Sequence, residues 1–196
     1  DEPVGERKMH AYFEYHIEQG PVLEAEGVEI GVVEGVQGIS WTELTLTGRS
    51  SHAGTTPMRL RRDAGLAAAR IATEVAAMAR EIGGDLVATV GSVKLTPNLV
   101  NVVAARAVIT VDLRHPDEAT LTGVEARFAA IVDRIAAEEK VEVARRSLAR
   151  FEPVDFDEAV VALVEATARR HGAGVKRMPS GAGHDAQMFA PNCPTG

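Results

Sequence analysis

His16 is the first residue whose type and position could support chemistry. It opens the segment HIEQGP at residues 16–21, directly after an aromatic-rich stretch at 10–16 that we expect to form a strand. An imidazole at the carboxyl end of a strand projects where open α/β sheets place their ligands. Its neutral nitrogen could bind a borderline-soft cation such as zinc. The alternative, a histidine that is only hydrogen-bonded at a strand end, stays open.

A second histidine, His52, lies in the segment SHAGTTP at residues 51–57, between an expected strand and an expected long helix. Small residues let a backbone approach a ligand closely, and a histidine among them could donate a hydrogen bond to a developing oxyanion. The same segment also has the pattern of a helix entry, with Thr56 as the N-cap and Pro57 at the first helical position. The two interpretations are compatible, but the helix entry leaves His52 unexplained.

Asn101 and Arg114 form a third candidate set. Asn101 ends the segment PNLVN at 97–101, in a loop between two expected strands, and Arg114 ends the second of these strands on its polar face. A guanidinium can bind a carboxylate with two parallel hydrogen bonds, and an amide adds a neutral donor. The pair would therefore suit the carboxylate of a small, amino-acid-like substrate. The structural alternative is an exposed Arg114 that pairs with Asp112 or Asp117.

The fourth segment is SGAGHD at residues 180–185, which precedes an expected short helix at 186–189. Successive backbone N–H groups at the start of a helix attract anions. A P-loop is excluded, because Lys followed by Ser or Thr does not come after the glycines. His184 and Asp185 could act as ligands, or they could hold a structural turn through their mutual hydrogen bonding.

The elements that position these segments follow from hydrophobic periodicity. Between residues 41 and 149 the pattern predicts strand, helix, strand, strand, helix and strand, the βαββαβ order of ferredoxin-like folds. The helices are expected at 64–82, ended by Gly83-Gly84, and from about 118 onward. The flanks are expected to hold a strand at 30–36 and a helix at 156–171. The expected strands of the βαββαβ unit are 41–47, 86–93, 107–113 and 141–143.

Neither flank of this unit looks able to build a core of its own. We therefore expect an α/β protein in which a βαββαβ domain, residues 39–150, is inserted into a larger mixed-sheet α/β domain. That larger domain would be represented by the segments 1–38 and 151–196.

Composition restricts the partners and the compartment. The chain has 196 residues and a formal net charge of −7, which argues against a nucleic-acid partner, and the basic run at 59–62 is expected to be a solvated face. Cys193 is the single cysteine, so an internal disulfide and CxxC chemistry are excluded and a cytoplasmic location is expected. We expect neither a membrane span nor a signal peptide at the start of the chain.

Taken together, the four segments resemble the hydantoinase/carbamoylase-type amidases of the M20 metallopeptidase clan. This group includes N-carbamoyl-L-amino-acid hydrolases, β-ureidopropionases and allantoate amidohydrolases. The resemblance covers essentially the whole chain, and it is specific to the family rather than to one substrate. It implies that His16 is a metal ligand and that Gln19 lies near the substrate. It also implies that His52 reaches an active site, often the partner subunit's, and polarises the scissile carbonyl.

The resemblance further implies that Asn101 and Arg114 bind the substrate carboxylate, and that Gly181, Gly183 and His184 line the pocket. The implied activity is metal-dependent hydrolysis of linear amide or ureido C–N bonds, with an N-carbamoyl-L-amino acid as the expected substrate. Allantoate and ureidopropionate are the alternatives. The implied assembly is a homodimer formed through the inserted domain, which would act as a lid.

The sequence also departs from this family. Such enzymes need an upstream His-x-Asp pair, an adjacent Glu-Glu pair that includes the general base, and a late histidine in a SHNPxE-like motif, and these motifs do not occur here. We therefore expect a fragment of a longer enzyme that binds two divalent cations per complete subunit, zinc or manganese, with cobalt or nickel as further options. The fragment alone is expected to be inactive, and the possibility that it binds no cation stays open. The rivals are a non-catalytic dimerisation or ligand-binding module and, within the clan, a dipeptidase.

Overall fold

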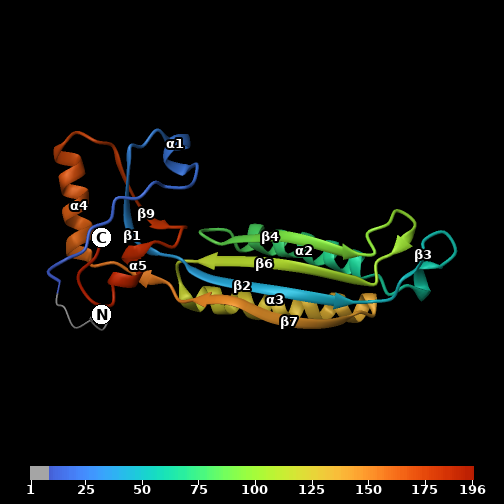
Figure 1. The fold of residues 1–196 in the computed structure, drawn as a ribbon. Coiled ribbons are helices and arrows are strands. Elements are labelled where there is room, and N and C mark those ends of the chain that lie inside the picture. Colours follow the sequence, from blue (N-terminus) through green and yellow to red (C-terminus); the bar gives the residue numbers. More distant parts are fainter. Residues whose placement is uncertain (1–8) are drawn as a thin grey trace. The chain divides into compact units, whose positions relative to one another are not determined.

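The computed structural model describes residues 9–196, and these residues form two compact units (Figure 1). One unit combines the described residues up to Gly38 with Glu152–Gly196, and the other comprises Ile39–Phe151. We refer to them as the discontinuous unit and the continuous unit. Across the described residues, the helices lack the combination of length and apolar character that crossing a bilayer requires.

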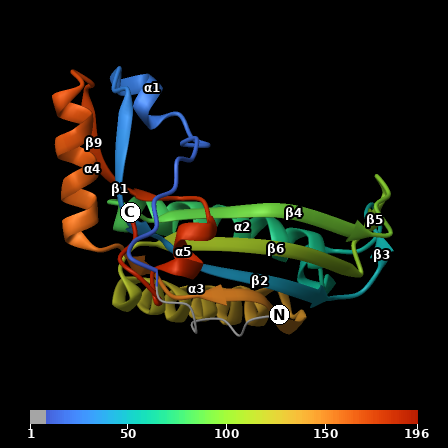
Figure 2. The same cartoon turned by 60° about the vertical axis from the view of Figure 1, so that its left-hand side comes forward.

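The continuous unit has the βαββαβ order that the sequence predicts, and its sheet has the strand order β4-β6-β2-β7. Figure 2 shows both of its helices behind the same face of this sheet. The elements are β2 (Gly38–Thr47), α2 (Ala64–Ile82), β4 (Val87–Thr96), β6 (Arg106–His115), α3 (Glu118–Glu139) and β7 (Glu142–Phe151). The strand predicted at 141–143 is therefore much longer than expected, because β7 follows β2 along nearly its whole length.

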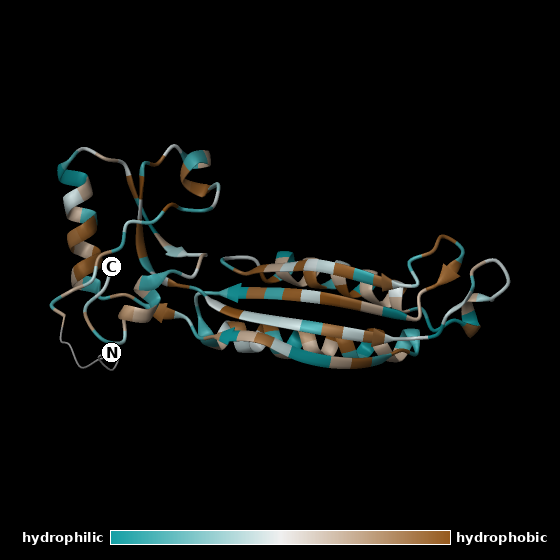
Figure 3. Ribbon diagram, in the orientation of Figure 1, coloured by the Kyte–Doolittle hydropathy of each residue, from teal (hydrophilic) through white to brown (hydrophobic). Residues whose placement is uncertain are grey.

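The alternation of apolar and polar residues along the strands builds the core of this unit. In β6, Ile109, Val111 and Leu113 are fully buried on the helix side, while the residues between them lie on the other face. Leu44 and Leu46 of β2 are buried beside them, and Figure 3 shows the resulting bands of apolar and polar residues along the strands. Burying each such side chain contributes about 1.5–3 kcal/mol, so this layer is the main source of stability.

Side-chain caps and left-handed residues set the ends of the helices. Asp63 Oδ1 accepts hydrogen bonds from the backbone N–H groups of Gly65 and Leu66, at 2.9 and 3.0 Å, and starts α2. Gly83 follows α2 with φ +67°, so the predicted stop is confirmed. Asp117 caps α3 in the same way by accepting from the Thr120 N–H at 2.7 Å.

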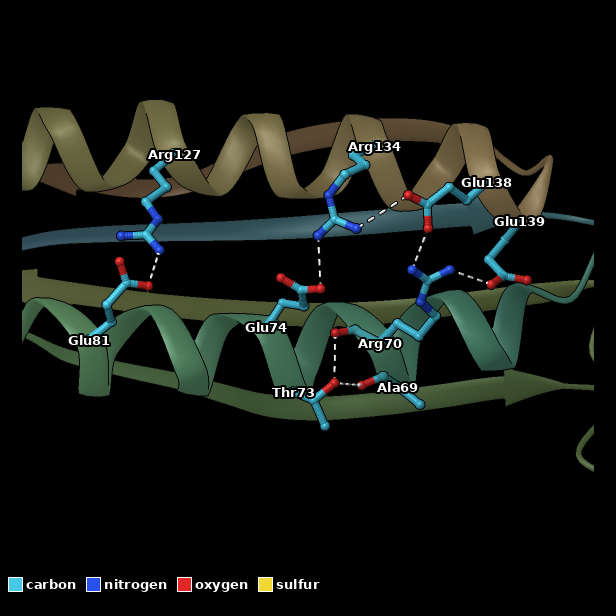
Figure 4. A network of polar contacts seen from close by, with 9 residues as sticks. All are labelled: Ala69, Arg70, Thr73, Glu74, Glu81, Arg127, Arg134, Glu138 and Glu139. Carbon is cyan, nitrogen blue, oxygen red and sulfur yellow. Dashed lines mark hydrogen bonds and ion pairs between the residues drawn. The ribbon is translucent and has the colours of Figure 1, made fainter.

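Ion pairs connect α2 and α3 on their outer surface (Figure 4). Arg134 bridges Glu74, at 2.8 Å, and Glu138, while Arg70 bridges Glu138 and Glu139. Arg127 pairs with Glu81 further along the helices. Each exposed pair contributes little by itself, up to about 1 kcal/mol, but the repeated pairing favours one register of the two helices.

The discontinuous unit contains a mixed sheet of three strands in the order β8-β1-β9. Strand β1 is antiparallel to β8 and parallel to β9. Its small core consists of Val32, Val36, Phe156, Val161 and Ala186. The elements are α1 (Val22–Glu26), β1 (Ile30–Val36), β8 (Val154–Asp155), α4 (Glu158–Arg170), β9 (Val175–Ser180) and α5 (Asp185–Phe189).

Two local predictions are wrong. Within the described residues, the segment 10–16 forms a single bridge, Tyr12 with Thr195, rather than a strand. Its backbone forms hydrogen bonds with Pro194 and Gly196. Thr56 is not a helix cap, because the turn that follows is a short 3-10 helix, η1 (Met58–Leu60), and the long helix starts from Asp63 instead.

The cap of α2 gives a stability prediction. Asp63→Ala leaves two N–H groups at the helix start without their acceptor, and it should lower the free energy of unfolding by about 1 kcal/mol. Asp63→Asn keeps a side-chain oxygen and should change it little. Urea unfolding followed by the fluorescence of Trp41, the single tryptophan and a residue of this unit, measures both. Equal losses for the two variants would contradict the assigned cap.

Candidate functional site

Two of the predicted segments meet in the continuous unit. Strand β3 (Ser51–His52) pairs in antiparallel fashion with β5 (Val102–Val103), which places His52 opposite Val102. The Ala53 N–H also donates to the Asn101 carbonyl at 2.9 Å. His52 and Asn101, which are both exposed, are therefore brought side by side by a short two-stranded ribbon.

Arg61 and Gly48 hold this ribbon in place. The half-buried Arg61 donates to the carbonyls of Ala53, at 2.6 Å, and Thr56, at 3.0 Å, and so ties both ends of the loop that follows His52. Gly48 donates to the Ala105 carbonyl, and a Cβ atom on it would lie 2.1 Å from the Arg62 carbonyl oxygen. The run 59–62, predicted to be a solvated face, thus contains a residue that fixes the loop.

The hydrogen bond that His52 accepts determines what its ring can do. The Gly54 N–H donates to His52 Nδ1 at 3.1 Å, so this nitrogen must offer its lone pair. In the neutral ring the proton then resides on Nε2. His52 therefore presents an N–H donor on an exposed loop, which is the group that an oxyanion needs.

Arg114 lies at the other end of β6 from this ribbon. Its guanidinium pairs with Asp112 at 2.7 Å and lies over the Trp41 ring, 5.7 Å from the ring centroid. The eight residue-to-residue steps from Arg106 to Arg114 span about 27 Å at the usual rise of a strand. One copy of the unit therefore does not bring Asn101 and Arg114 together, and the pairing of Arg114 with Asp112 matches the structural alternative.

A second set of candidates meets in the discontinuous unit. The rings of His16 and His184 are stacked, with centroids 5.4 Å apart. His16 Nδ1 lies 2.5 Å from the Ile17 carbonyl oxygen, which can only accept, so Nδ1 carries the proton and Nε2 keeps its lone pair. That is the arrangement of an imidazole ready to bind a cation through Nε2, with a carbonyl on the other nitrogen.

Glu14 lies beside these two rings and was not found from the sequence. Burial raises the pKa of its carboxyl group, but the hydrogen bonds from the Ala186 N–H and His184 outweigh burial, so the pKa lies below its usual value. The Coulomb interaction with His184 and His16 acts in the same direction when these rings are protonated. The sequence offered one faint signal, since Glu14 stands two residues before His16 and would share its face of an extended chain.

The remaining predicted site residues lie close to His16 or to His184 in the sequence. Gln19 is exposed and adopts a left-handed backbone conformation, φ +57°. Gly181 and Gly183 are exposed in the turn after β9, where a Cβ on Gly183 would meet Gln187 Oε1 at 3.4 Å. The Ser180 hydroxyl donates to the Ala182 carbonyl at 2.9 Å and orders the turn. The structure thus gives this turn a defined shape.

The described residues do not contain a cluster of three or more His, Cys, Asp or Glu side chains that could hold a metal ion. His16 is thus one nitrogen donor and not a complete site. Its fitness for a cation rests on the free Nε2 lone pair and on the exposure of the ring.

The chain belongs to the peptidase family M20/M25/M40, whose family model matches residues 2–196. It is 48% identical over 195 residues to an N-carbamoyl-L-amino-acid amidohydrolase of Rhizobium meliloti, covering 100% of this chain and 47% of that protein. It is 40% identical over 187 residues to the allantoate amidohydrolase of Escherichia coli K12, covering 95% and 46% of the two chains.

The chain is also similar to a solved structure of a hydantoinase/carbamoylase-family amidase. The crystal structure of an amidase of the hydantoinase/carbamoylase family from Burkholderia multivorans matches with a TM-score of 0.96 at 46% identity, over 100% of this chain and 47% of that one. The resemblance predicted from the four segments is thereby confirmed at the level of the family. The chain spans about half the length of the curated relatives that it matches.

Gly48 provides a test of how the His52 loop is built. Gly48→Ala forces a Cβ against the Arg62 carbonyl, so the loop must move, at a cost of about 1–3 kcal/mol in unfolding free energy. The matched control is Gly123→Ala in the exposed middle of α3, which should stabilise by about 0.5–1 kcal/mol. Urea unfolding measures both variants. A Gly48→Ala protein as stable as the parent would contradict the close approach of residue 48 to the Arg62 carbonyl.

Proposed function

We propose that the protein carrying this chain is a metal-dependent hydrolase of linear amide or ureido C–N bonds, most specifically an N-carbamoyl-L-amino acid amidohydrolase. The observation that carries the reaction class is the opposite hydrogen bonding of two histidines. His16 keeps a lone pair on Nε2, which suits a cation, whereas His52 keeps a proton on Nε2, which suits an oxyanion. The names of the relatives support the substrate class.

His16 would hold a divalent cation, zinc or manganese, as one ligand of a site whose other ligands lie outside the described residues. Two such cations, when bound, would acidify a shared water and polarise the scissile carbonyl. The fit of His16 rests on its ring, which the Ile17 carbonyl orients from behind.

The other candidates would bind and orient the substrate. Arg114 would bind the substrate carboxylate through its guanidinium fork, with Asn101 as a neutral donor, and Trp41 and Asp112 would orient that fork. His52 would donate its Nε2–H to the oxygen on which charge develops. A second group, Gln19, Gly181, Gly183 and His184, would line the pocket around the cation that His16 holds.

We further propose that residues 39–150 form a lid and dimerisation domain, and that 1–38 and 151–196 are segments of the catalytic domain. One copy separates Arg114 from His52 and Asn101 by the length of β6, so a site that uses all three needs a second copy. Both edge strands expose apolar side chains, Val87 and Val93 on β4 and Leu148 and Phe151 on β7. Strand β7 also carries Arg145 and Arg146 in ion pairs within the unit. The β4 edge is the better candidate for pairing between copies.

The full-length protein tests the proposed activity. It should hydrolyse N-carbamoyl-L-amino acids, lose that activity on treatment with a chelator, and regain it with zinc or manganese. Product formation with a panel of N-carbamoyl-L-amino acids, allantoate, 3-ureidopropionate and dipeptides measures this. Preference for allantoate or ureidopropionate would change the substrate within the same class. Turnover of dipeptides alone, or undiminished turnover by the metal-free protein, would contradict the proposal.

Mixing two impaired variants tests the shared site, when activity is assayed at a substrate concentration well below the raised KM of Arg114→Ala. His52→Ala should lower kcat and Arg114→Ala should raise KM, because one group acts on the transition state and the other on substrate binding. If the two residues serve one site from different subunits, a mixed dimer has one intact site. Random reassociation of equal amounts should then restore about one quarter of native activity, by the two-fold symmetry of the dimer.

The control for this experiment is a mixture of Arg114→Ala with an Arg114→Ala, His52→Ala double variant, in which each site in every dimer lacks Arg114. It should stay inactive. If the mixture of single variants also stayed inactive although the subunits exchange, His52 and Arg114 would not meet across a dimer.

A further inference from the structure

One carboxylate oxygen of Glu14 accepts two hydrogen bonds. Glu14 Oε2 lies 2.6 Å from the Ala186 backbone nitrogen and 3.2 Å from His184 Nδ1. Both side chains are largely shielded, since that of Glu14 is 17% exposed and that of His184 is 6% exposed. This contact joins residues that are 170 positions apart in the sequence.

The contact fixes which nitrogen of His184 carries a proton. An ionised carboxylate can only accept, so Nδ1 of His184 must be the donor, and in the neutral ring Nε2 then keeps its lone pair. The ring is also confined from two sides, by the stacked His16 ring and by Phe156, whose ring lies edge-on at 5.9 Å. Glu14 thus selects both the tautomer and the direction in which Nε2 points.

The same oxygen also orders the turn that carries His184. The Ala186 N–H belongs to the first turn of α5, where backbone donors lack partners within the helix. By accepting from it, Glu14 holds the start of α5 and, with it, the turn at 180–185. Orientation of the ring and position of the turn therefore depend on one side chain.

Glu14 is itself held by groups other than the histidines. The Tyr12 N–H donates to the Pro194 carbonyl at 2.8 Å, and the Glu14 N–H donates to the Gly196 carbonyl at 3.2 Å. The Tyr12 ring stacks on Phe189 of α5, with centroids 4.2 Å apart. The carboxylate is therefore presented from a fixed backbone and does not depend on His184 for its place.

We propose that Glu14 is a positioning residue, which holds His184 in the Nδ1–H tautomer with Nε2 directed to the substrate pocket and holds the turn at 180–185 in the shape that lines this pocket. The part that concerns the substrate rests on the proposed function. The part that concerns the tautomer does not.

The tautomer is tested by ¹⁵N NMR of the imidazole nitrogens in the full-length protein, near pH 8.5, about two units above the ordinary imidazole pKa. His184 should show a protonated Nδ1 and an unprotonated Nε2. In Glu14→Ala the two tautomers should mix, whereas Glu14→Gln retains an acceptor oxygen and should keep the native pattern. A protonated Nε2 in the parent protein, or an unchanged pattern in Glu14→Ala, would overturn the proposal.

Kinetics test the effect on the reaction, with Asp157 as the matched control. Asp157 also caps a helix of this unit, but it accepts from the backbone N–H groups of Ala159 and Val160, at 3.0 and 3.1 Å, and not from a histidine. Glu14→Ala should lower kcat/KM by about 10–100-fold, as loss of a group that orients a site histidine does. Glu14→Gln should recover much of this loss, and Asp157→Ala should leave kcat/KM near the parent value.

These outcomes separate the two hypotheses. Equal losses in Glu14→Ala and Asp157→Ala would show that Glu14 acts only on folding, and the proposal for Glu14 would fail. If the NMR pattern depends on Glu14 as expected while the protein does not hydrolyse any ureido or carbamoyl substrate, the proposed function fails and the role of Glu14 in setting the tautomer stands.

Discussion

Strand β6, which is buried along one face, is the constraint on which the arrangement of candidate residues in the continuous unit depends. Ile109, Val111 and Leu113 are packed against two helices, so the strand cannot bend without opening the core. Its two ends therefore stay apart, with the ribbon of His52 and Asn101 near the start and Arg114 near the finish. A single copy of the unit therefore does not bring Arg114 to His52 and Asn101.

The hydrogen-bond partner of Nδ1 differentiates three histidines that are chemically identical. The Gly54 N–H makes Nδ1 of His52 an acceptor, the Ile17 carbonyl makes Nδ1 of His16 a donor, and the Glu14 carboxylate does the same for His184. Two of these partners lie within two residues of the histidine, so the short motif itself determines the tautomer. This gives a physical reason why the residues next to His16 and His52 belong to their motifs.

The sequence predicted those features that depend on local periodicity. Helix α2 was predicted with its observed limits, because apolar residues recur at helical spacing up to a glycine that ends it. The segment 10–16 was wrongly predicted to be a strand, because aromatic content does not specify the partner that a ladder needs, and the segment forms only the bridge of Tyr12 with Thr195. Glu14 and Arg61 were missed for a related reason. Their roles arise from contacts with a distant helix and with loop carbonyls, which spacing along the chain does not encode.

The order in which the two units fold follows from the pairing of β2 with β7. Strand β2 leaves the discontinuous unit and β7 returns to it, and the pair Ile39–Phe151 holds these two exits in register. Folding of the continuous unit thus closes the long loop between the two halves of the other unit, and the entropy of that closure is already lost when β1 meets β8. A core as small as that around Val32 and Phe156 would offset little of this entropy alone. We therefore expect the continuous unit to fold first and the histidine cluster of the discontinuous unit to assemble afterwards.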